Sequence, residues 1–188
     1  MNQINKAVKI LKQGGIIAYP TETTYGIGCN IFNEKAVKKI FEIKGRDFNK
    51  PLLVAVSSFK MMQDICFIPE KYIDLIKKYL PGPVTFLWNK KNNVSNLITQ
   101  SSDLVGIRFP DNKKALKIIE KCNFPIISTS ANISGQKDSI NWKQVKLNVD
   151  FIVKGRCKYK KPTSVINLMD KKILRKGYNI EKYEGIIE

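Results

Sequence analysis

Short apolar segments alternate with amphipathic segments along most of this chain, and this alternation limits the possible folds more than any other feature. Apolar positions recur with helical spacing over residues 4–13 and stop at Gly14-Gly15. An apolar run typical of a strand follows at 16–19, and helices then alternate with single strands, later with pairs of strands. We therefore expect an α/β fold with a twisted mixed sheet flanked by helices.

Further elements are expected on the same grounds. Asn33 is a suitable N-cap for a helix that follows it. Helices are also expected at 59–65, 70–79, 113–121, 141–147 and 180–187, and strands at 52–56, 84–88, 105–109, 125–128, 151–153, 164–168 and 173–175. The sequence shows no repeats and no convincing linker, so we expect one domain over residues 1–188.

The chain is strongly basic, with 33 Lys and Arg against 16 Asp and Glu and a formal net charge of +17. A basic surface attracts polyanions, which favours a nucleotide or RNA partner. A lysine-rich composition that simply fills solvated positions explains the excess equally well. Arginine is rare in this chain, and the four that occur favour bidentate contacts to phosphate or carboxylate: Arg46, Arg108, Arg156 and Arg175.

The chain contains no histidine, which excludes Ser-His-Asp triads, Cys-His pairs and histidine-zinc sites. Its four cysteines are far apart and form no CxxC pair, which favours buried thiols in a reducing compartment. No run approaches about 18 apolar residues, and the lysine-rich N-terminal segment lacks the apolar stretch of a signal peptide. We therefore expect a cytoplasmic protein that does not contact a membrane.

Four loops place hydroxyl, glycine or cationic residues next to an apolar strand, where α/β proteins usually bind ligands. They are PTETTYGIG at 20–28, KGRDFNKPL at 44–52, VGIRFPDN at 105–112 and STSANISG at 128–135. Neither a P-loop nor a GxGxxG fingerprint is present. A ligand site in these loops would therefore act through positioned charges, hydroxyls and amides.

Each of these loops also has a purely structural interpretation. Lys44 and Arg46 can clamp a polyphosphate or cap the end of the preceding helix. Arg108 lies in an apolar strand, where it can form a buried ion pair or bind a substrate carboxylate. The hydroxyls after Ser128 can bind phosphate or form ordinary turns, and Tyr25 can stack on a base or belong to the core.

Taken together, the loops resemble the YrdC-type threonylcarbamoyl-AMP synthase family. Its motifs are P-T-[DE]-T-x-Y-G-[LI]-G, K-x-R, P-G-P-x-T, V-x-[VI]-R-x-P and S-A-N-x-S-G. This sequence has them in that order at 20–28, 44–46, 81–85, 105–110 and 130–135. The resemblance runs from about Gly14 to Arg175, and the chain length is similar to that of the short, single-domain form. It implies a YrdC-like fold with a basic concave face.

The resemblance also implies an activity: L-threonine, bicarbonate and ATP, with Mg2+, give threonylcarbamoyl-AMP and pyrophosphate. A downstream threonylcarbamoyl transferase complex then modifies tRNA, and weak tRNA binding by the chain itself is possible in this scheme. Carried over by motif, Lys44 and Arg46 would be catalytic. The ATP contacts would be Lys44, Arg46, Lys50, Ser130, Asn132 and Arg175, the threonine contacts would be Thr23, Tyr25, Arg108, Ser128 and Thr163, and no side chain is assigned to a metal.

One position of the chain departs from the family pattern, and two rival interpretations of its function remain. Many relatives have histidine where this chain has Ala55, near the expected threonine pocket. The rivals are a non-catalytic module that binds tRNA or double-stranded RNA, and the YrdC-like domain of hydrogenase maturation. If the enzymatic interpretation holds, Arg46→Ala should weaken ATP use, and Arg108→Ala should raise the threonine requirement while leaving the fold intact.

Overall fold

A computed structural model of the chain describes residues 2–187. Its α-helices are α1 (Gln3–Lys12), α2 (Glu34–Lys44), α3 (Phe59–Ile65), α4 (Ile73–Lys77), α5 (Asn96–Thr99), α6 (Lys113–Cys122) and α7 (Glu181–Glu184), with 3-10 helices η1 (Glu70–Tyr72) and η2 (Trp142–Gln144). Its strands are β1 (Ile17–Tyr19), β2 (Gly26–Gly28), β3 (Leu53–Ala55), β4 (Cys66–Phe67), β5 (Val84–Lys90), β6 (Leu104–Arg108), β7 (Ile126–Ile127), β8 (Thr129–Ser130), β9 (Phe151–Ile152), β10 (Ser164–Asn167) and β11 (Lys172–Arg175).

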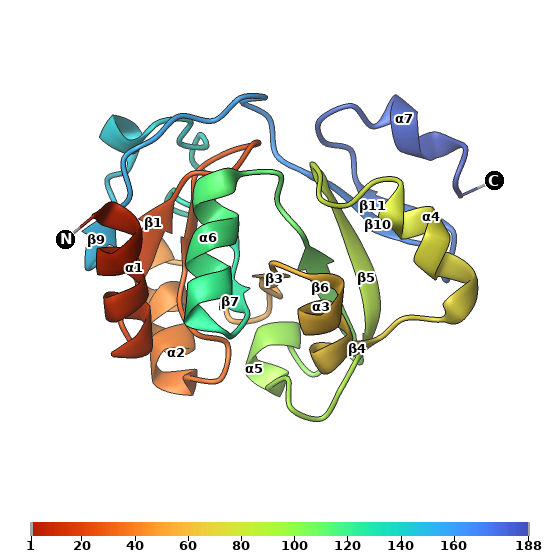
Figure 1. Ribbon diagram of the computed structural model, residues 1–188, viewed down its shortest axis with the longest axis horizontal. Coiled ribbons are helices and arrows are strands. Elements are labelled where there is room, and N and C mark those ends of the chain that lie inside the picture. The colour runs from red at the N-terminus through yellow and green to blue at the C-terminus, as the bar shows by residue number, and fades with distance from the viewer. Residues whose placement is uncertain (1, 188) are drawn as a thin grey trace.

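The strands form two mixed sheets that lie side by side (Figure 1). The smaller sheet has the order β8-β2-β1-β9, and β1 is antiparallel to β2 but parallel to β9. The larger sheet has the order β11-β10-β5-β6-β3-β7, and β4 pairs with β5 outside this path. The expected α/β fold with mixed sheets and flanking helices is confirmed, although the sequence predicted one sheet and not two.

The chain passes from one sheet to the other between β7 and β8, which are separated by Ser128 alone. The β7 strand pairs with β3 of the larger sheet, and β8 pairs with β2 of the smaller one. Ser128 is buried, and its backbone N–H donates to the carbonyl of Leu53 over 2.7 Å. We call the STSANISG segment at 128–135 the hydroxyl loop. Ser128 therefore fixes the distance between this loop and the edge of the larger sheet.

Local sequence explains most of the helix ends. The Asn33 side chain accepts a hydrogen bond from the Ala36 backbone N–H, as the N-cap prediction requires. Helix α2 ends at Gly45, whose positive φ of 54° suits glycine. Helix α6 packs beside α1, and both bury their apolar faces. None of the helices described is long and apolar enough to cross a membrane.

Two segments differ from the sequence predictions. Residues 26–28 were expected in a loop but form strand β2, because its glycines allow close approach: a Cβ on Gly28 would lie 2.3 Å from the Ile127 carbonyl oxygen. The helix expected at 141–147 is only the short η2. Beyond it, Val145 and Leu147 are buried while Lys146 is exposed, which is the two-residue period of an extended chain.

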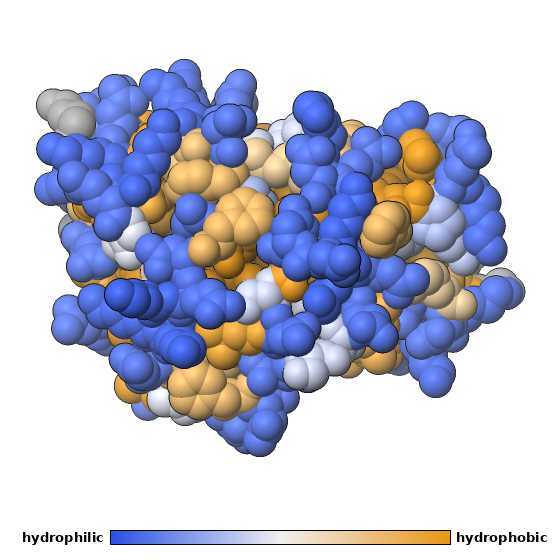
Figure 2. All heavy atoms as spheres, turned by 90° about the horizontal axis from the view of Figure 1, so that it is seen from below, coloured by the Kyte–Doolittle hydropathy of each residue, from blue (hydrophilic) through white to orange (hydrophobic). Residues whose placement is uncertain are grey.

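The surface seen from below is mostly hydrophilic, with apolar atoms exposed in several separate patches between hydrophilic residues (Figure 2). Whether the concave face is specifically basic stays a prediction, as does the assignment of all 188 residues to one domain.

Candidate active site

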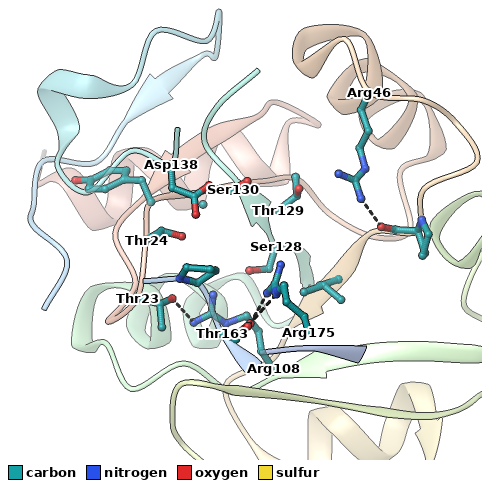
Figure 3. Close-up of a pocket in the computed structure, with 15 residues that line it drawn as sticks. Thr23, Thr24, Arg46, Arg108, Ser128, Thr129, Ser130, Asp138, Thr163 and Arg175 are labelled. Atoms are coloured by element: carbon teal, nitrogen blue, oxygen red, sulfur yellow. Dashed lines mark hydrogen bonds between the residues drawn. The ribbon is translucent and has the colours of Figure 1, made fainter. Parts of the chain in front are cut away.

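The four loops singled out in the sequence converge on one pocket between the two sheets (Figure 3). It has a cavity of about 180 Å3. Eight of the predicted site residues line it: Thr23, Tyr25, Arg46, Arg108, Ser128, Ser130, Thr163 and Arg175. Lys44, Lys50 and Asn132 are not among the lining residues.

A buried ion pair forms one end of the pocket. The Arg108 Nη2 atom, at the end of β6, donates to Glu22 Oε1 over 2.7 Å and to Thr23 Oγ1 over 3.2 Å. Both charged side chains are almost completely buried, with exposed fractions of 7% and 2%. The Arg108 Nε and Glu22 Oε2 atoms have no hydrogen-bond partner among the described residues. The pair is therefore held by one contact and is not a saturated bidentate bridge.

The sequence analysis missed several residues of this site, among them Glu22 and the pocket-lining Asp138. Burial raises the pKa of the Glu22 carboxyl, and the neighbouring Arg108 guanidinium acts in the opposite direction. The signal was present, because Glu22 occupies the acidic position of the P-T-[DE]-T motif. Its partner lies 86 positions away in the chain, so no local pattern could identify the pair.

The loop that carries Glu22 is held from above by a segment that crosses between the sheets. After β9 the chain runs along the top of the molecule in Figure 1 toward β10, and we call residues 153–163 the crossing segment. In this crossing segment, the Tyr159 N–H donates to the Glu22 carbonyl over 2.8 Å, and the Lys160 N–H donates to the Thr23 carbonyl over 3.1 Å. The loop is therefore fixed by backbone bonds as well as by Arg108.

Thr163 lies at the end of the crossing segment and joins three elements at the pocket floor. Its hydroxyl accepts from Arg175 Nη2 over 2.8 Å and lies 3.1 Å from the hydroxyl of Thr85. Arg175 Nε also donates to the Thr163 carbonyl over 2.9 Å. Burial, followed by the nearby Arg108 charge, lowers the pKa of Arg175, so two cations stand close together here. Such a pair attracts an anion.

Tyr25 lines the pocket, but its hydroxyl points elsewhere. The side chain is fully buried, and the hydroxyl donates to the Val153 carbonyl over 2.6 Å. The sequence left open whether Tyr25 contacts a ligand or belongs to the core, and its packing is that of a core residue. Its role in threonine binding stays a prediction.

Lys44 connects helix α2 to the hydroxyl loop. Its ammonium group donates to the carbonyl oxygens of Ser130 and Asn132, over 2.5 and 2.6 Å, and approaches Asn132 Oδ1 at 3.5 Å. The Ser134 N–H donates in return to the Lys44 carbonyl over 2.9 Å. Burial, and secondarily the Arg46 charge, lowers the pKa of Lys44 to about 8. The ammonium group therefore holds the hydroxyl loop through the carbonyl oxygens of Ser130 and Asn132. The contact between Lys44 and ATP stays a prediction.

The K-x-R loop carries Arg46 into the pocket on the side opposite Arg108 (Figure 3). Its guanidinium is steadied by the loop's own backbone, with Nη2 donating to the Pro51 carbonyl over 2.9 Å. Lys50 lies on the same loop, but it is exposed and does not line the pocket. Its ATP contact also stays a prediction.

Charge in the pocket is unbalanced. Three arginines line it, whereas Asp138 is the acidic side chain among the described lining residues. The described residues contain no group of three or more His, Cys, Asp or Glu that could hold a metal. A pocket lined by three arginines suits a ligand that carries several negative charges.

Comparison with known proteins identifies the family. A model of the Sua5/YciO/YrdC family, described as "Telomere recombination", matches residues 9–177. The chain belongs to this family. A Methanocaldococcus jannaschii member, named provisionally as a threonylcarbamoyl-AMP synthase, is 37% identical over 181 residues, which cover 90% of this chain and 84% of that protein.

Two further comparisons come from Pyrococcus abyssi. A threonylcarbamoyl-AMP synthase is 42% identical over 135 residues, covering 71% of this chain but 40% of that protein. The crystal structure of Sua5 complexed with L-threonine has a TM-score of 0.93 and 35% identity, covering 98% of this chain and 57% of that one. The chain therefore spans about half the length of the P. abyssi chain in each of these two comparisons. The predicted family and its fold are confirmed, while the roles of individual site residues stay predictions.

Proposed function

We propose that the chain is a threonylcarbamoyl-AMP synthase, which converts L-threonine, bicarbonate and ATP to threonylcarbamoyl-AMP and pyrophosphate. One observation carries the proposal: the same pocket has arginines set among hydroxyls at one end, and an arginine with a hydroxyl loop at the other. Arg108 with Thr23 suits the carboxylate and hydroxyl of an amino acid, and Arg46 with Ser130 suits a polyphosphate. The relatives named threonylcarbamoyl-AMP synthase and the threonine-bound P. abyssi Sua5 support this assignment.

The proposed chemistry needs positioning more than acid-base groups. Bicarbonate takes up a proton and loses water to give carbon dioxide, the threonine amine adds to the carbon and releases a proton to give a carbamate, and a carbamate oxygen attacks the α-phosphorus of ATP. A new P–O bond forms while the bond to the β-phosphate breaks, and pyrophosphate leaves with the electron pair. Arg46 and Arg175 stand where they would offset the charge that accumulates on the phosphate oxygens. The Arg108 end would hold threonine in line with that phosphorus.

Mg2+ accompanies ATP in this proposal. Magnesium keeps several water ligands and binds mainly to substrate phosphates, so a dedicated protein cage is unnecessary. Asp138 and the Ser130 hydroxyl are the pocket oxygens that fit its remaining contacts. When bound, the ion would neutralise phosphate charge.

The wider assignment belongs to the same proposal. The product would pass to a threonylcarbamoyl transferase complex that modifies tRNA in the cytoplasm. The charge of +17 fits contact with tRNA, and also fits the rival of a non-catalytic RNA-binding module.

Pyrophosphate release separates the two. The chain would be incubated with ATP, Mg2+ and bicarbonate, with and without L-threonine, and with L-serine as the matched amino acid that lacks one methyl group. Threonine-dependent release that falls with serine is expected. Salt-sensitive RNA binding with no release in any mixture would overturn the synthase assignment in favour of the module.

A further inference from the structure

The middle of the crossing segment has no side chain buried in the core. Residues 158–162 are exposed or half-buried, whereas Cys157 before them and Thr163 after them are buried. Three of these five residues are lysines, and like charges close together repel one another. The same stretch nevertheless supplies the backbone N–H groups that hold the carbonyl oxygens of Glu22 and Thr23. A contact outside the core must therefore keep this part of the chain in place.

The backbone of this stretch is strained at Lys160. Its φ is 58°, in the left-handed region that residues other than glycine, asparagine and aspartate rarely adopt. In this conformation the Lys160 N–H donates to the Thr23 carbonyl over 3.1 Å. Such a conformation persists only where the surrounding contacts enforce it. Loss of those contacts should let Lys160 relax and release the carbonyl of Thr23.

A stack of two tyrosine rings provides the missing contact. The rings of Tyr159 and Tyr178 are nearly parallel, at 13°, and their centroids lie 4.0 Å apart. Tyr178 follows strand β11, so the stack joins the crossing segment to the C-terminal segment. Among the described residues, neither tyrosine belongs to the two hydrophobic clusters of the core or packs against them. The stack therefore holds a surface segment and does not build the core.

Backbone contacts fix Tyr178 against the crossing segment. Its N–H donates to the Pro162 carbonyl over 2.8 Å, and the Gly177 N–H donates to the Ser164 hydroxyl over 3.1 Å. The two segments lie so close together that a Cβ on Gly177 would clash with the carbonyl group of Thr163. The Tyr178 ring is thus presented to its partner from a well-placed backbone.

We propose that Tyr178 is a positioning residue for the Arg108 end of the pocket. Its ring stacks on Tyr159 and so keeps the neighbouring Lys160 in place. The Lys160 N–H then holds the Thr23 carbonyl, and the Thr23 hydroxyl accepts from Arg108. This inference rests on the proposed function, because it takes L-threonine to bind at that end. A stack that only stabilises the surface is the alternative, and it predicts no selective loss of threonine binding.

The first test measures L-threonine binding by isothermal titration calorimetry, which needs no turnover. Tyr178→Ala should weaken binding about fivefold, which corresponds to about 1 kcal/mol, the usual contribution of an aromatic pair. Tyr178→Phe keeps the stack and should bind threonine like the native chain. The KM for ATP should be unchanged in both variants. Tyr178→Leu, which has an apolar side chain but no ring, gives the same test if the alanine variant does not fold.

Tyr72→Ala is the matched control for stability. It also removes one ring of an aromatic pair, since Tyr72 lies 5.7 Å from Trp88 between ring centroids, but Tyr72 does not line the active-site pocket. Tyr72 packs against the core, so urea unfolding should show at least as large a loss of stability as in Tyr178→Ala. Its threonine affinity should not change, which would separate positioning from general destabilisation.

Amide hydrogen exchange tests the step between the stack and the pocket. The N–H groups of Tyr159 and Lys160 donate to the loop that carries Thr23, so their exchange reports on this attachment. Both should exchange about fivefold faster in Tyr178→Ala than in Tyr178→Phe, because the lost stack favours local opening. The Ser128 N–H lies on the opposite wall of the pocket, and its exchange should not change.

Three results would overturn the proposal: equal threonine affinity in the alanine and phenylalanine variants, equal weakening in Tyr178→Ala and Tyr72→Ala, or unchanged amide exchange in Tyr178→Ala. The proposed function fails separately. If Tyr178→Ala selectively weakens threonine binding but no mixture releases pyrophosphate, the positioning role stands and the synthase assignment falls. If threonine-dependent release is normal and the Tyr178 variants behave like the native chain, the synthase stands and the positioning role falls.

Discussion

The two ends of the active-site pocket are built in different ways. At the end proposed to hold the amino acid, Arg108 and Glu22 form a buried pair, and the loop around them is tied by backbone bonds to the crossing segment. At the end proposed to hold the phosphates, Arg46 lies on a loop with exposed residues, and Lys44 holds the hydroxyl loop by donating to its carbonyl oxygens. The first end is part of the core, whereas the second is attached to it. Substitutions at the Arg108 end should therefore lower both activity and stability. Substitutions at the Arg46 end should lower activity and leave stability nearly unchanged.

Arg108→Ala should have the largest effect, and on both properties. Removing one partner of a buried pair leaves the Glu22 charge uncompensated, which lowers the free energy of unfolding by about 3 kcal/mol. Threonine-dependent pyrophosphate release should fall at least about a hundredfold, because a lost charge-assisted contact to a carboxylate costs about 3 kcal/mol. Urea unfolding and initial rates measure the two effects.

The double variant Arg108→Ala with Glu22→Gln is the control for that prediction. Neutralising the orphaned carboxylate should restore part of the lost stability without restoring activity. If Arg108→Ala alone has native stability, the two ends of the pocket do not differ in the way described above.

Arg46→Ala should show the opposite behaviour. The KM for ATP should rise about tenfold, since a charged hydrogen bond to phosphate is lost, while the free energy of unfolding changes by less than about 0.5 kcal/mol. Lys38→Ala provides the matched control, because it removes an exposed cation from helix α2, outside the pocket. An equal loss in both variants would mean that the general positive charge of this surface, and not the position of Arg46, supports ATP use.

The pH dependence should distinguish the hydrogen bonds between Lys44 and the hydroxyl loop from the stability of the whole fold. The pKa of Lys44 is lowered to about 8, so its ammonium loses a proton as pH rises through that value and can no longer serve all of its acceptors. Activity should therefore decline above about pH 8, and Lys44→Arg should remove this decline because arginine stays charged.

Stability should change in the other direction over the same range. The unfolded chain keeps the Lys44 proton up to its ordinary pKa, so between the two values it binds more protons than the folded chain, and the free energy of unfolding rises with pH. Parallel loss of activity and stability above pH 8 would show that the whole fold is responding and not the hydroxyl loop.

Tyr25→Phe should have the smallest effect. Its hydroxyl donates to the Val153 carbonyl, so the variant should lose about 1 kcal/mol of unfolding free energy. The KM for threonine should stay within a factor of two, because the hydroxyl does not point into the pocket. A rise beyond that factor, measured in the same pyrophosphate assay, would support the predicted contact between Tyr25 and threonine.

Local features of the fold were predictable from the sequence because they depend on neighbouring residues. The Asn33 cap, the helix stop near Gly14 and the hydroxyl loops after apolar strands follow from patterns a few positions long. The family motifs added the order of the loops, and the pocket brings most of their predicted residues together. Which ligand each residue contacts stays a prediction.

Long-range pairing accounts for what the sequence did not reveal. Arg108 in an apolar strand suggested either a structural ion pair or a substrate contact, and the ion pair is present, with Glu22 as its partner. For that reason the expectation that Arg108→Ala leaves the fold intact is replaced here by a loss of stability. The division into two sheets was equally hidden, because it depends on the partners chosen by β7 and β8 and not on their own short sequences.

The passage of the chain between the sheets through Ser128 alone limits how relatives can vary in length. An insertion between β7 and β8 would push the hydroxyl loop away from Arg108 and Leu53, and would separate the two halves of the pocket. Among the described residues, helix α7 contributes none that line the pocket, so this part of the chain can accept added segments. Evolution of the family should therefore conserve spacing at this junction strictly and place its insertions elsewhere.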